Sequence, residues 1–231
     1  MMAFKAEAVF GVHLVVRHRA PRLAAALALA AGVSAGVGGV GTDPTTACRI
    51  LLLLMGCTTA VCASRVLAAG PPLASARHVA VVSWLPVLGR FAGVMVLVAG
   101  GAGVLSLGLF RGAAPGIAAR AFAGGALHAA ATAALVLAVT PRIGAVAAAA
   151  VGVVVTVAGS ATPGQLDAFF AAAESPPLRA VTVPWLVLPV PWRAVAWFAH
   201  GSVADLGVLL TWLAGGLWVA SLQVARPQPG G

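Results

Sequence analysis

Residues 121–161 read AFAGGALHAAATAALVLAVTPRIGAVAAAAVGVVVTVAGSA, and Arg142 is the single Asp, Glu, Lys or Arg in this stretch. Arg142 lies between two apolar runs, Ala121–Thr140 and Ile143–Ala161. A helix rises about 1.5 Å per residue, so roughly 20 apolar residues are enough to cross the hydrocarbon core of a bilayer. The stretch therefore predicts two transmembrane helices that follow one another directly.

Four more apolar runs of similar length lie outside this stretch, and none of the six has an Asp, Glu or Lys in its middle. In chain order the six runs are Leu23–Val40, Ile50–Ala69, Phe91–Phe110, Ala121–Thr140, Ile143–Ala161 and Leu206–Val224. Helices satisfy their own backbone hydrogen bonds and can therefore cross lipid. We predict an all-α integral membrane protein, with an N-terminal interfacial helix at residues 1–22 and a six-helix transmembrane bundle at residues 23–231.

Composition excludes the soluble classes of protein. Hydrophobic residues make up 61% of the chain and charged residues 8%, whereas a soluble domain has about 25% charged residues. The net charge of +9 is compatible with nucleic-acid binding in principle. The cations, however, lie in the links beside the apolar runs, so the partner that they indicate is a lipid bilayer and not a nucleic acid.

The distribution of Lys and Arg predicts the orientation in the membrane. With a cytoplasmic N-terminus, nine of these residues fall inside and five outside, and short cytoplasmic loops are the ones that carry the excess of Lys and Arg. The inside set is Lys5, Arg17, Arg19, Arg22, Arg65, Arg77, Arg90, Arg142 and Arg226, and the outside set is Arg49, Arg111, Arg120, Arg179 and Arg193. We expect a multi-pass protein of the inner (plasma) membrane with both termini in the cytoplasm.

Two links between the runs are long enough to carry structure of their own. In Gly70–Arg90, the apolar stretch Val79–Leu88 is too short to cross, and it predicts either a short surface helix starting near Ser75 or a plain loop with a longer third span. The link Ser160–Ala204 is rich in Pro and Trp. Such backbone cannot face lipid unprotected, so we expect two short re-entrant helices there.

Few side chains in this chain could carry chemistry. Lys5 is the only lysine, which excludes a G-x-x-x-x-G-K-[ST] phosphate loop. The spans lack the central carboxylates that ion-coupled carriers use, and Asp205 is expected to cap the last helix. His128 is either a functional group or a neutral histidine bonded to a facing carbonyl. The three cysteines, Cys48, Cys57 and Cys62, are expected to be buried and free. We predict no catalytic, cofactor-binding or metal-binding residue in this chain.

The order and lengths of these segments resemble the membrane subunit of type-2 ABC transporters, the exporter class of permease. That family has an N-terminal interfacial helix, a coupling helix between spans two and three, and re-entrant helices between spans five and six. The counterparts in this chain are Phe4–Arg19, Leu73–Leu88 and Gln165–Ala199. Gly70 and the sequence from Arg90 to Gly93 could fill the turn before the coupling helix and the entry to span three.

The resemblance implies that a separate cytoplasmic ABC ATPase drives the chain, which has no ATPase motif and is not itself an enzyme. It also implies a pair of permeases, either a homodimer or a dimer with a related chain. Because no acid lies between Asp43 and Asp167, basic residues would have to make the ATPase contact, and the candidates are Arg65, Arg77, His78 and Arg90. The apolar spans favour an amphipathic or lipid-like cargo. The alternative is a polytopic membrane protein without transport activity, such as an assembly factor, a structural factor or an intramembrane enzyme.

Overall fold

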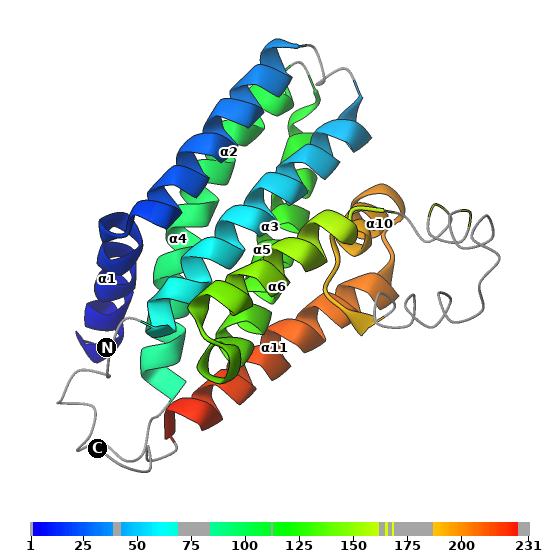
Figure 1. Ribbon diagram of the computed structural model, residues 1–231. Coiled ribbons are helices and arrows are strands. Elements are labelled where there is room, and N and C mark those ends of the chain that lie inside the picture. The colour runs from blue at the N-terminus through cyan, green and yellow to red at the C-terminus, as the bar shows by residue number, and fades with distance from the viewer. Residues whose placement is uncertain are drawn as a thin grey trace.

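The computed structural model describes residues 2–38, 43–68, 84–111, 113–161, 165, 168 and 187–225. All regular structure in these ranges is helical, which confirms the all-α class (Figure 1). The helices are α1 (Met2–Arg17), α2 (Arg19–Val37), α3 (Pro44–Ala68), α4 (Trp84–Leu109), α5 (Pro115–Ile143), α6 (Ala145–Ala158), α10 (Pro191–His200) and α11 (Val203–Ala225).

Five of these helices, α2, α3, α4, α5 and α11, are long and apolar enough to cross a membrane. They run back and forth beside one another, and α5 is the most buried of them (Figure 1). Small side chains explain this position, since the run Ala129–Ala134 is buried and lets neighbouring helices come close to the α5 backbone. Large apolar side chains point outward instead from α2 and α11, among them Leu23, Leu27, Val33, Leu210, Trp218 and Leu222. This outer surface suits lipid and confirms a membrane protein.

The fifth predicted span, Ile143–Ala161, contains a helix shorter than the other long helices. Within Ile143–Ala161 the helix α6 has 14 residues, which corresponds to about 21 Å against a hydrocarbon core of about 30 Å. Gly144 separates α5 from α6 with a φ of +81°, a conformation that few residues other than glycine adopt. The structure therefore supports five long membrane helices, and the count of six spans stays a prediction.

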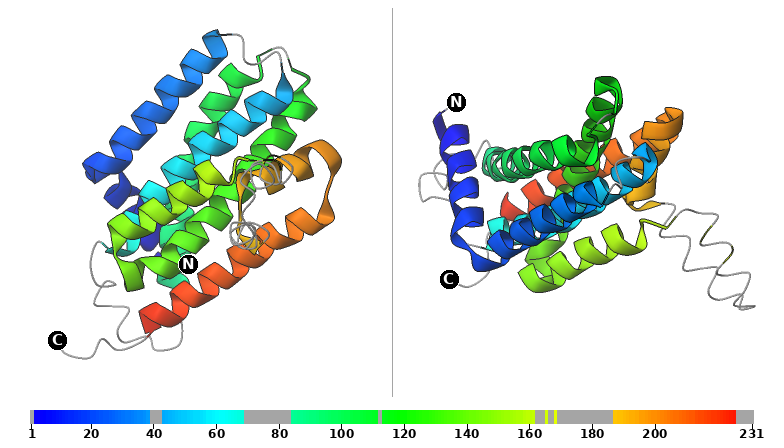
Figure 2. Two further views of the ribbon diagram at one scale, coloured as in Figure 1. Left: turned by 45° about the vertical axis from the view of Figure 1, so that its right-hand side comes forward. Right: turned by 90° about the horizontal axis from the view of Figure 1, so that it is seen from above.

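The N-terminal region divides into two helices at His18. Pro21 lies in the first turn of α2, where a missing backbone N–H is tolerated. Seen from above, α1 runs across one end of the bundle, at a steep angle to the long helices (Figure 2). The beginning of α1 and the end of α11 lie at this same end (Figure 1).

The two long links are described only in part. Residues 69–83 lie outside the described part of the chain, and Trp84–Arg90 form the first two turns of α4. The last residues of the expected coupling helix Leu73–Leu88 therefore belong to the third long helix, as in the alternative of a longer span. The link in which two re-entrant helices are expected contains α10, and the re-entrant arrangement stays a prediction; residues 162–164, 166–167 and 169–186 of this link lie outside the described ranges.

Candidate functional site

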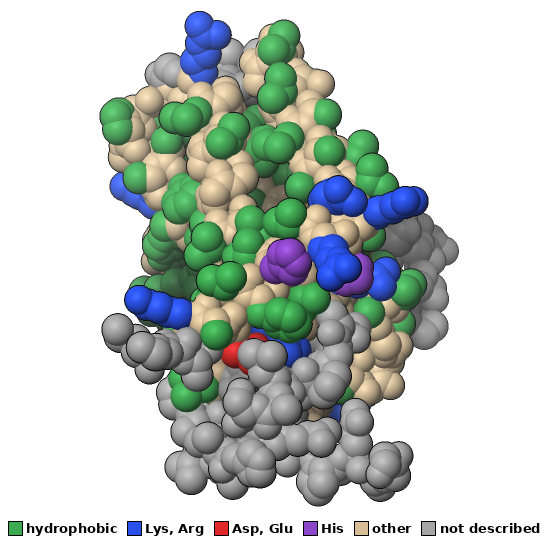
Figure 3. All heavy atoms as spheres, turned by 90° about the vertical axis from the view of Figure 1, so that its left-hand side faces the viewer, with side chains coloured by type: hydrophobic (Ala, Val, Ile, Leu, Met, Phe, Trp, Pro, Cys, Tyr) green, Lys and Arg blue, Asp and Glu red, His purple; other side chains and the backbone are tan. Residues whose placement is uncertain are grey.

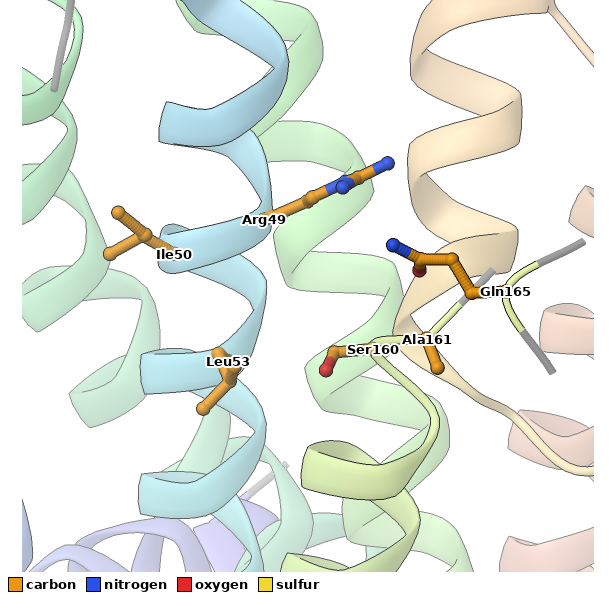
Figure 4. Close-up of a pocket in the computed structure, with 6 residues that line it drawn as sticks. All are labelled: Arg49, Ile50, Leu53, Ser160, Ala161 and Gln165. Carbon is orange, nitrogen blue, oxygen red and sulfur yellow. The ribbon is translucent and has the colours of Figure 1, made fainter. Parts of the chain in front are cut away.

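A pocket opens between the first turns of α3 and the end of α6, at the end of the bundle opposite α1. It has a volume of about 520 Å³, within the range typical of small-molecule sites. Its lining residues are Arg49, Ile50, Leu53, Ser160, Ala161 and Gln165, and we call it the Arg49 pocket. The side chains of Arg49 and Gln165 extend toward one another across its opening, so charged and polar groups meet there (Figure 4).

Arg49 makes this pocket positively charged. The nearest acid along α3 is Asp43, whose carboxylate accepts hydrogen bonds from the backbone N–H groups of Thr45 (3.0 Å) and Thr46 (3.1 Å). The Thr46 hydroxyl first, then these backbone bonds and the charge of Arg49, hold the pKa of Asp43 below its ordinary value. Asp43 caps α3, and Arg49 is the charged side chain among the described residues that line the pocket.

Polar side chains gather in the centre of the bundle around Gly56, which follows Leu53 by one turn of α3. His128 of α5 and Thr156 of α6 meet at Gly56 of α3. We group them as the His128 cluster with Thr132, four residues after His128, and Thr59, three residues after Gly56; all four side chains are fully buried. Gly56 on α3 leaves the space for it. A Cβ at Gly56 would lie 2.7 Å from both the His128 Nε2 and the Thr156 Oγ1, so both side chains face the same bare backbone.

Most polar atoms of the His128 cluster are unsatisfied within the described part of the chain. The Thr156 hydroxyl donates to the Gly152 carbonyl (2.9 Å). Both ring nitrogens of His128 and the hydroxyls of Thr59 and Thr132 have no hydrogen-bond partner there; the Pro189 carbonyl lies near the ring without completing a bond. An unsatisfied buried polar atom costs about 1–3 kcal/mol, so the cluster is a place where water or a polar ligand group would be stabilised.

A buried ion pair holds α1 against α4 at the other end of the bundle. The Arg90 Nε donates to the Glu7 Oε2 (3.1 Å), and its Nη1 donates to the Val66 carbonyl in the last turn of α3 (3.1 Å). The guanidinium also lies 5.3 Å from the centre of the Phe10 ring. Arg90 is 3% exposed and Glu7 5% exposed. One side chain thus joins three helices.

The backbones of α1 and α4 approach closely around this ion pair. A Cβ at Gly89 would lie 2.6 Å from the Glu7 Cβ, and a Cβ at Gly93 would lie 2.5 Å from the Ala8 carbonyl oxygen. No side chain other than glycine fits at these two positions without moving α1. Close helix packing and the ion pair therefore act together to fix α1 on the first two turns of α4.

The predicted ATPase-contact residues divide into three groups. Arg65 lies in the last turns of α3 and is partly exposed, at the same end of the bundle as α1. Arg90 lies at this end too, but its guanidinium faces inward and pairs with Glu7. Arg77 and His78 lie outside the described residues. The structure thus brings Arg65 and Arg90 to one end, and it gives Arg90 an internal contact that the sequence did not indicate.

Asp205 does not cap α11, contrary to the expectation. Its Oδ1 lies 2.6 Å from the Nη1 of Arg193, and both side chains are largely buried between α10 and α11. The capping contact comes from Ser202, whose hydroxyl accepts from the Asp205 backbone N–H (3.4 Å). The carboxylate is drawn inward because the buried Arg193 guanidinium, which also donates to the Leu188 carbonyl (3.2 Å), needs a counter-charge. This ion pair fixes α10 to the last long helix.

No protein-family model matches the chain, and neither a curated protein nor a solved structure matches it. The cysteines are free, with Cys48 and Cys62 buried as predicted and Cys57 half-buried. Within the described ranges, no three His, Cys, Asp or Glu side chains come together as a metal site. The candidate positions for function are the Arg49 pocket at one end of the bundle, the His128 cluster in its centre and the Glu7–Arg90 contact at the other end.

Proposed function

We propose that the chain is the membrane-spanning permease subunit of a type-2 ABC exporter, which moves an amphipathic or lipid-like substrate with energy from a separate cytoplasmic ATPase. In this proposal α6 and its flanking residues complete a sixth crossing. The α1 helix lies at the cytoplasmic interface, and α10 belongs to the re-entrant pair. Two copies, or one copy with a related chain, form the transport pathway in the plasma membrane.

The observation that carries the proposal is the Glu7–Arg90 contact. Arg90 lies in the second turn of α4, the helix that follows the segment 70–83 in which we place the ATPase contact. Because its guanidinium bonds both Glu7 of α1 and the Val66 carbonyl of α3, a displacement of that segment would move three helices together. Arg90 is then a positioning residue, whereas Arg65, Arg77 and His78 reach the ATPase.

The Arg49 pocket supports an amphipathic cargo. Arg49, the one cation among the described residues that line it, suits an anionic head group. The outer faces of the bundle are apolar and suit hydrocarbon chains. A substrate with both parts would be recognised by its head group in the pocket while its apolar part stays in contact with lipid.

The proposal also agrees with what the sequence lacks. A chain with one lysine and no phosphate loop cannot obtain energy from ATP by that route. Energy from a partner is then the simplest source for uphill transport. If the chain has no ATPase partner, the remaining candidate is a polytopic membrane protein without transport activity.

The coupling contact is tested by the ATPase rate of the complex in lipid nanodiscs. Arg65→Ala, Arg77→Ala and His78→Ala are each compared with the unaltered permease. Arg111→Ala, an exposed cation at the opposite end of the bundle, is the matched control. We expect the three variants to lose stimulation of the ATPase while they keep their unfolding temperature, and the control to retain it. An unchanged rate in all three variants would reject the placement of the contact.

A further inference from the structure

A second cavity lies within the membrane-spanning part of the bundle, between α2, α3 and α4. It has a volume of about 270 Å³ and an almost wholly apolar lining. Apolar side chains from the three helices form its walls, including Ala28, Leu29, Leu54, Val98, Ala102 and Leu105. Among the described residues of the lining, Arg22 is the one charged side chain, and we call this space the Arg22 cavity.

The cavity ends where α2 packs directly on α4. There a Cβ at Gly32 would overlap the Leu105 side chain, and a Cβ at Gly36 would lie 3.2 Å from the Gly108 carbonyl oxygen. Toward α1 the space is lined by Pro21, Arg22 and Ala25 of α2 and by Val15 and Val16 of α1. We take this end, beside Arg22, as the entrance for an apolar chain.

Positive charge surrounds this entrance. Arg17, His18, Arg19 and Arg22 are all exposed around the α1–α2 junction. Glu7 is the only acid in α1 and α2, and Arg90 already neutralises it. On the face of the molecule drawn in Figure 3, Lys, Arg and His side chains gather at one level beside hydrophobic side chains. The entrance is thus cationic, whereas the interior of the cavity is apolar.

We propose that the Arg22 cavity binds one acyl chain of an anionic phospholipid from the leaflet in which α1 lies, with the phosphate on Arg22 and its neighbouring arginines. The apolar interior fits a hydrocarbon chain, and an unfilled space of this kind forfeits dispersion contacts that the chain would supply. Charge complementarity selects the head group, because anionic lipids are attracted to basic residues at the membrane surface. The inference goes beyond the proposed transport function, since the site would exist in a membrane protein of any activity.

The test is native mass spectrometry of the detergent-solubilised chain, titrated with phosphatidylglycerol or with phosphatidylcholine of the same acyl chains. We expect one molecule of phosphatidylglycerol to be retained at concentrations at which phosphatidylcholine is not. Arg22→Gln should weaken phosphatidylglycerol binding about fivefold, the effect of one basic residue. Ala28→Phe, which fills the cavity, should abolish the retained lipid.

Matched controls make each outcome informative. Leu27→Phe adds the same ring on the outward face of α2, where Leu27 is 69% exposed, and Arg120→Gln removes an exposed cation at the opposite end. Both should bind as the unaltered chain does. Equal retention of the two lipids, or equal loss in Ala28→Phe and Leu27→Phe, would overturn the proposal. Arg22→Gln alters no packed side chain and decides the question if Ala28→Phe does not fold. The lipid-binding result is independent of the ATPase-rate test, so either proposal can fail without the other.

Discussion

Replacement of Glu7 by leucine tests the contact on which the proposed coupling depends. Glu7→Leu keeps the size of the side chain and removes both carboxylate oxygens. The Arg90 guanidinium, 3% exposed and 3.1 Å from the Glu7 Oε2, would be left as a buried charge without its counter-ion. Removal of one partner from a buried ion pair costs about 3–5 kcal/mol.

The size of the effect can be stated as a change in unfolding temperature. For chains of about this length, 1 kcal/mol corresponds to roughly 2–4 °C. Glu7→Leu should therefore unfold about 6–20 °C below the unaltered chain. Lys5→Gln, on the exposed face of the same helix, should change the unfolding temperature by no more than about 2 °C, since exposed charges contribute little.

The double variant Glu7→Leu with Arg90→Met separates the ion pair from the size of the side chains. An apolar pair removes both charges, so most of the lost stability should return. The Val66 carbonyl, which accepts from Arg90 (3.1 Å), would lose its donor, and a residual cost of about 1 kcal/mol is expected.

A thiol-reactive fluorophore provides the assay. Cys48 and Cys62 are buried and Cys57 is half-buried, so their reaction with the dye reports unfolding during a temperature ramp in detergent. The reasoning would be refuted if Glu7→Leu unfolded at the same temperature as Lys5→Gln. It would equally be refuted if the double variant were destabilised by the sum of the two single variants.

Three further predictions concern helix contacts. Gly93→Ala should lower the unfolding temperature and loosen α1, because the new Cβ would lie 2.5 Å from the Ala8 carbonyl oxygen; Gly100→Ala on the same helix meets nothing within 4 Å and serves as the control. Asp43→Ala should speed hydrogen exchange at the first amides of α3. The pKa of Asp43 is lowered, chiefly by the hydrogen bond from the Thr46 hydroxyl. The stabilisation by this cap is therefore fully present above pH 3.8, the ordinary pKa, and is lost as the pH falls through the lowered pKa of the folded chain. Asp205→Asn should cost about 2 kcal/mol by thermal unfolding, since the buried Arg193 loses its counter-charge but keeps an acceptor.

The long helices could be predicted from the sequence because each contains one apolar run that is long enough to cross a membrane. The exception is the run Ile143–Ala161, in which the helix α6 spans only Ala145–Ala158. Hydropathy measures the length of an apolar run but not where its backbone leaves the helix, and Gly159 with the residues after it ends α6 early. The break between the N-terminal helix and the first span was predicted, but α2 begins at Arg19, four residues before the predicted start of the span at Leu23.

The site was less predictable because its contacts join distant residues. Glu7 and Arg90 are 83 positions apart, and no local spacing relates them. A signal was nevertheless present, since Glu7 is the one acid among the nine cations assigned to its side of the membrane. The spacing of Gly32 and Gly36 is typical of close helix packing but names no partner, and the structure identifies α4 as a partner. The Arg49 pocket could not be foreseen, because α3 and α6 meet there only in the folded bundle.

The composition of the complex purified from membranes in mild detergent tests the central claim most directly. The chain should carry an affinity tag at either end and be extracted without denaturation, and the bound proteins should be quantified by mass spectrometry. If the chain is the permease of an ABC exporter, a cytoplasmic P-loop ATPase should be bound in a stoichiometric ratio to the tagged chain. The same ATPase should be absent when a tagged membrane protein of another class is purified as a control. A homogeneous preparation of the chain without any such ATPase would contradict the proposed function.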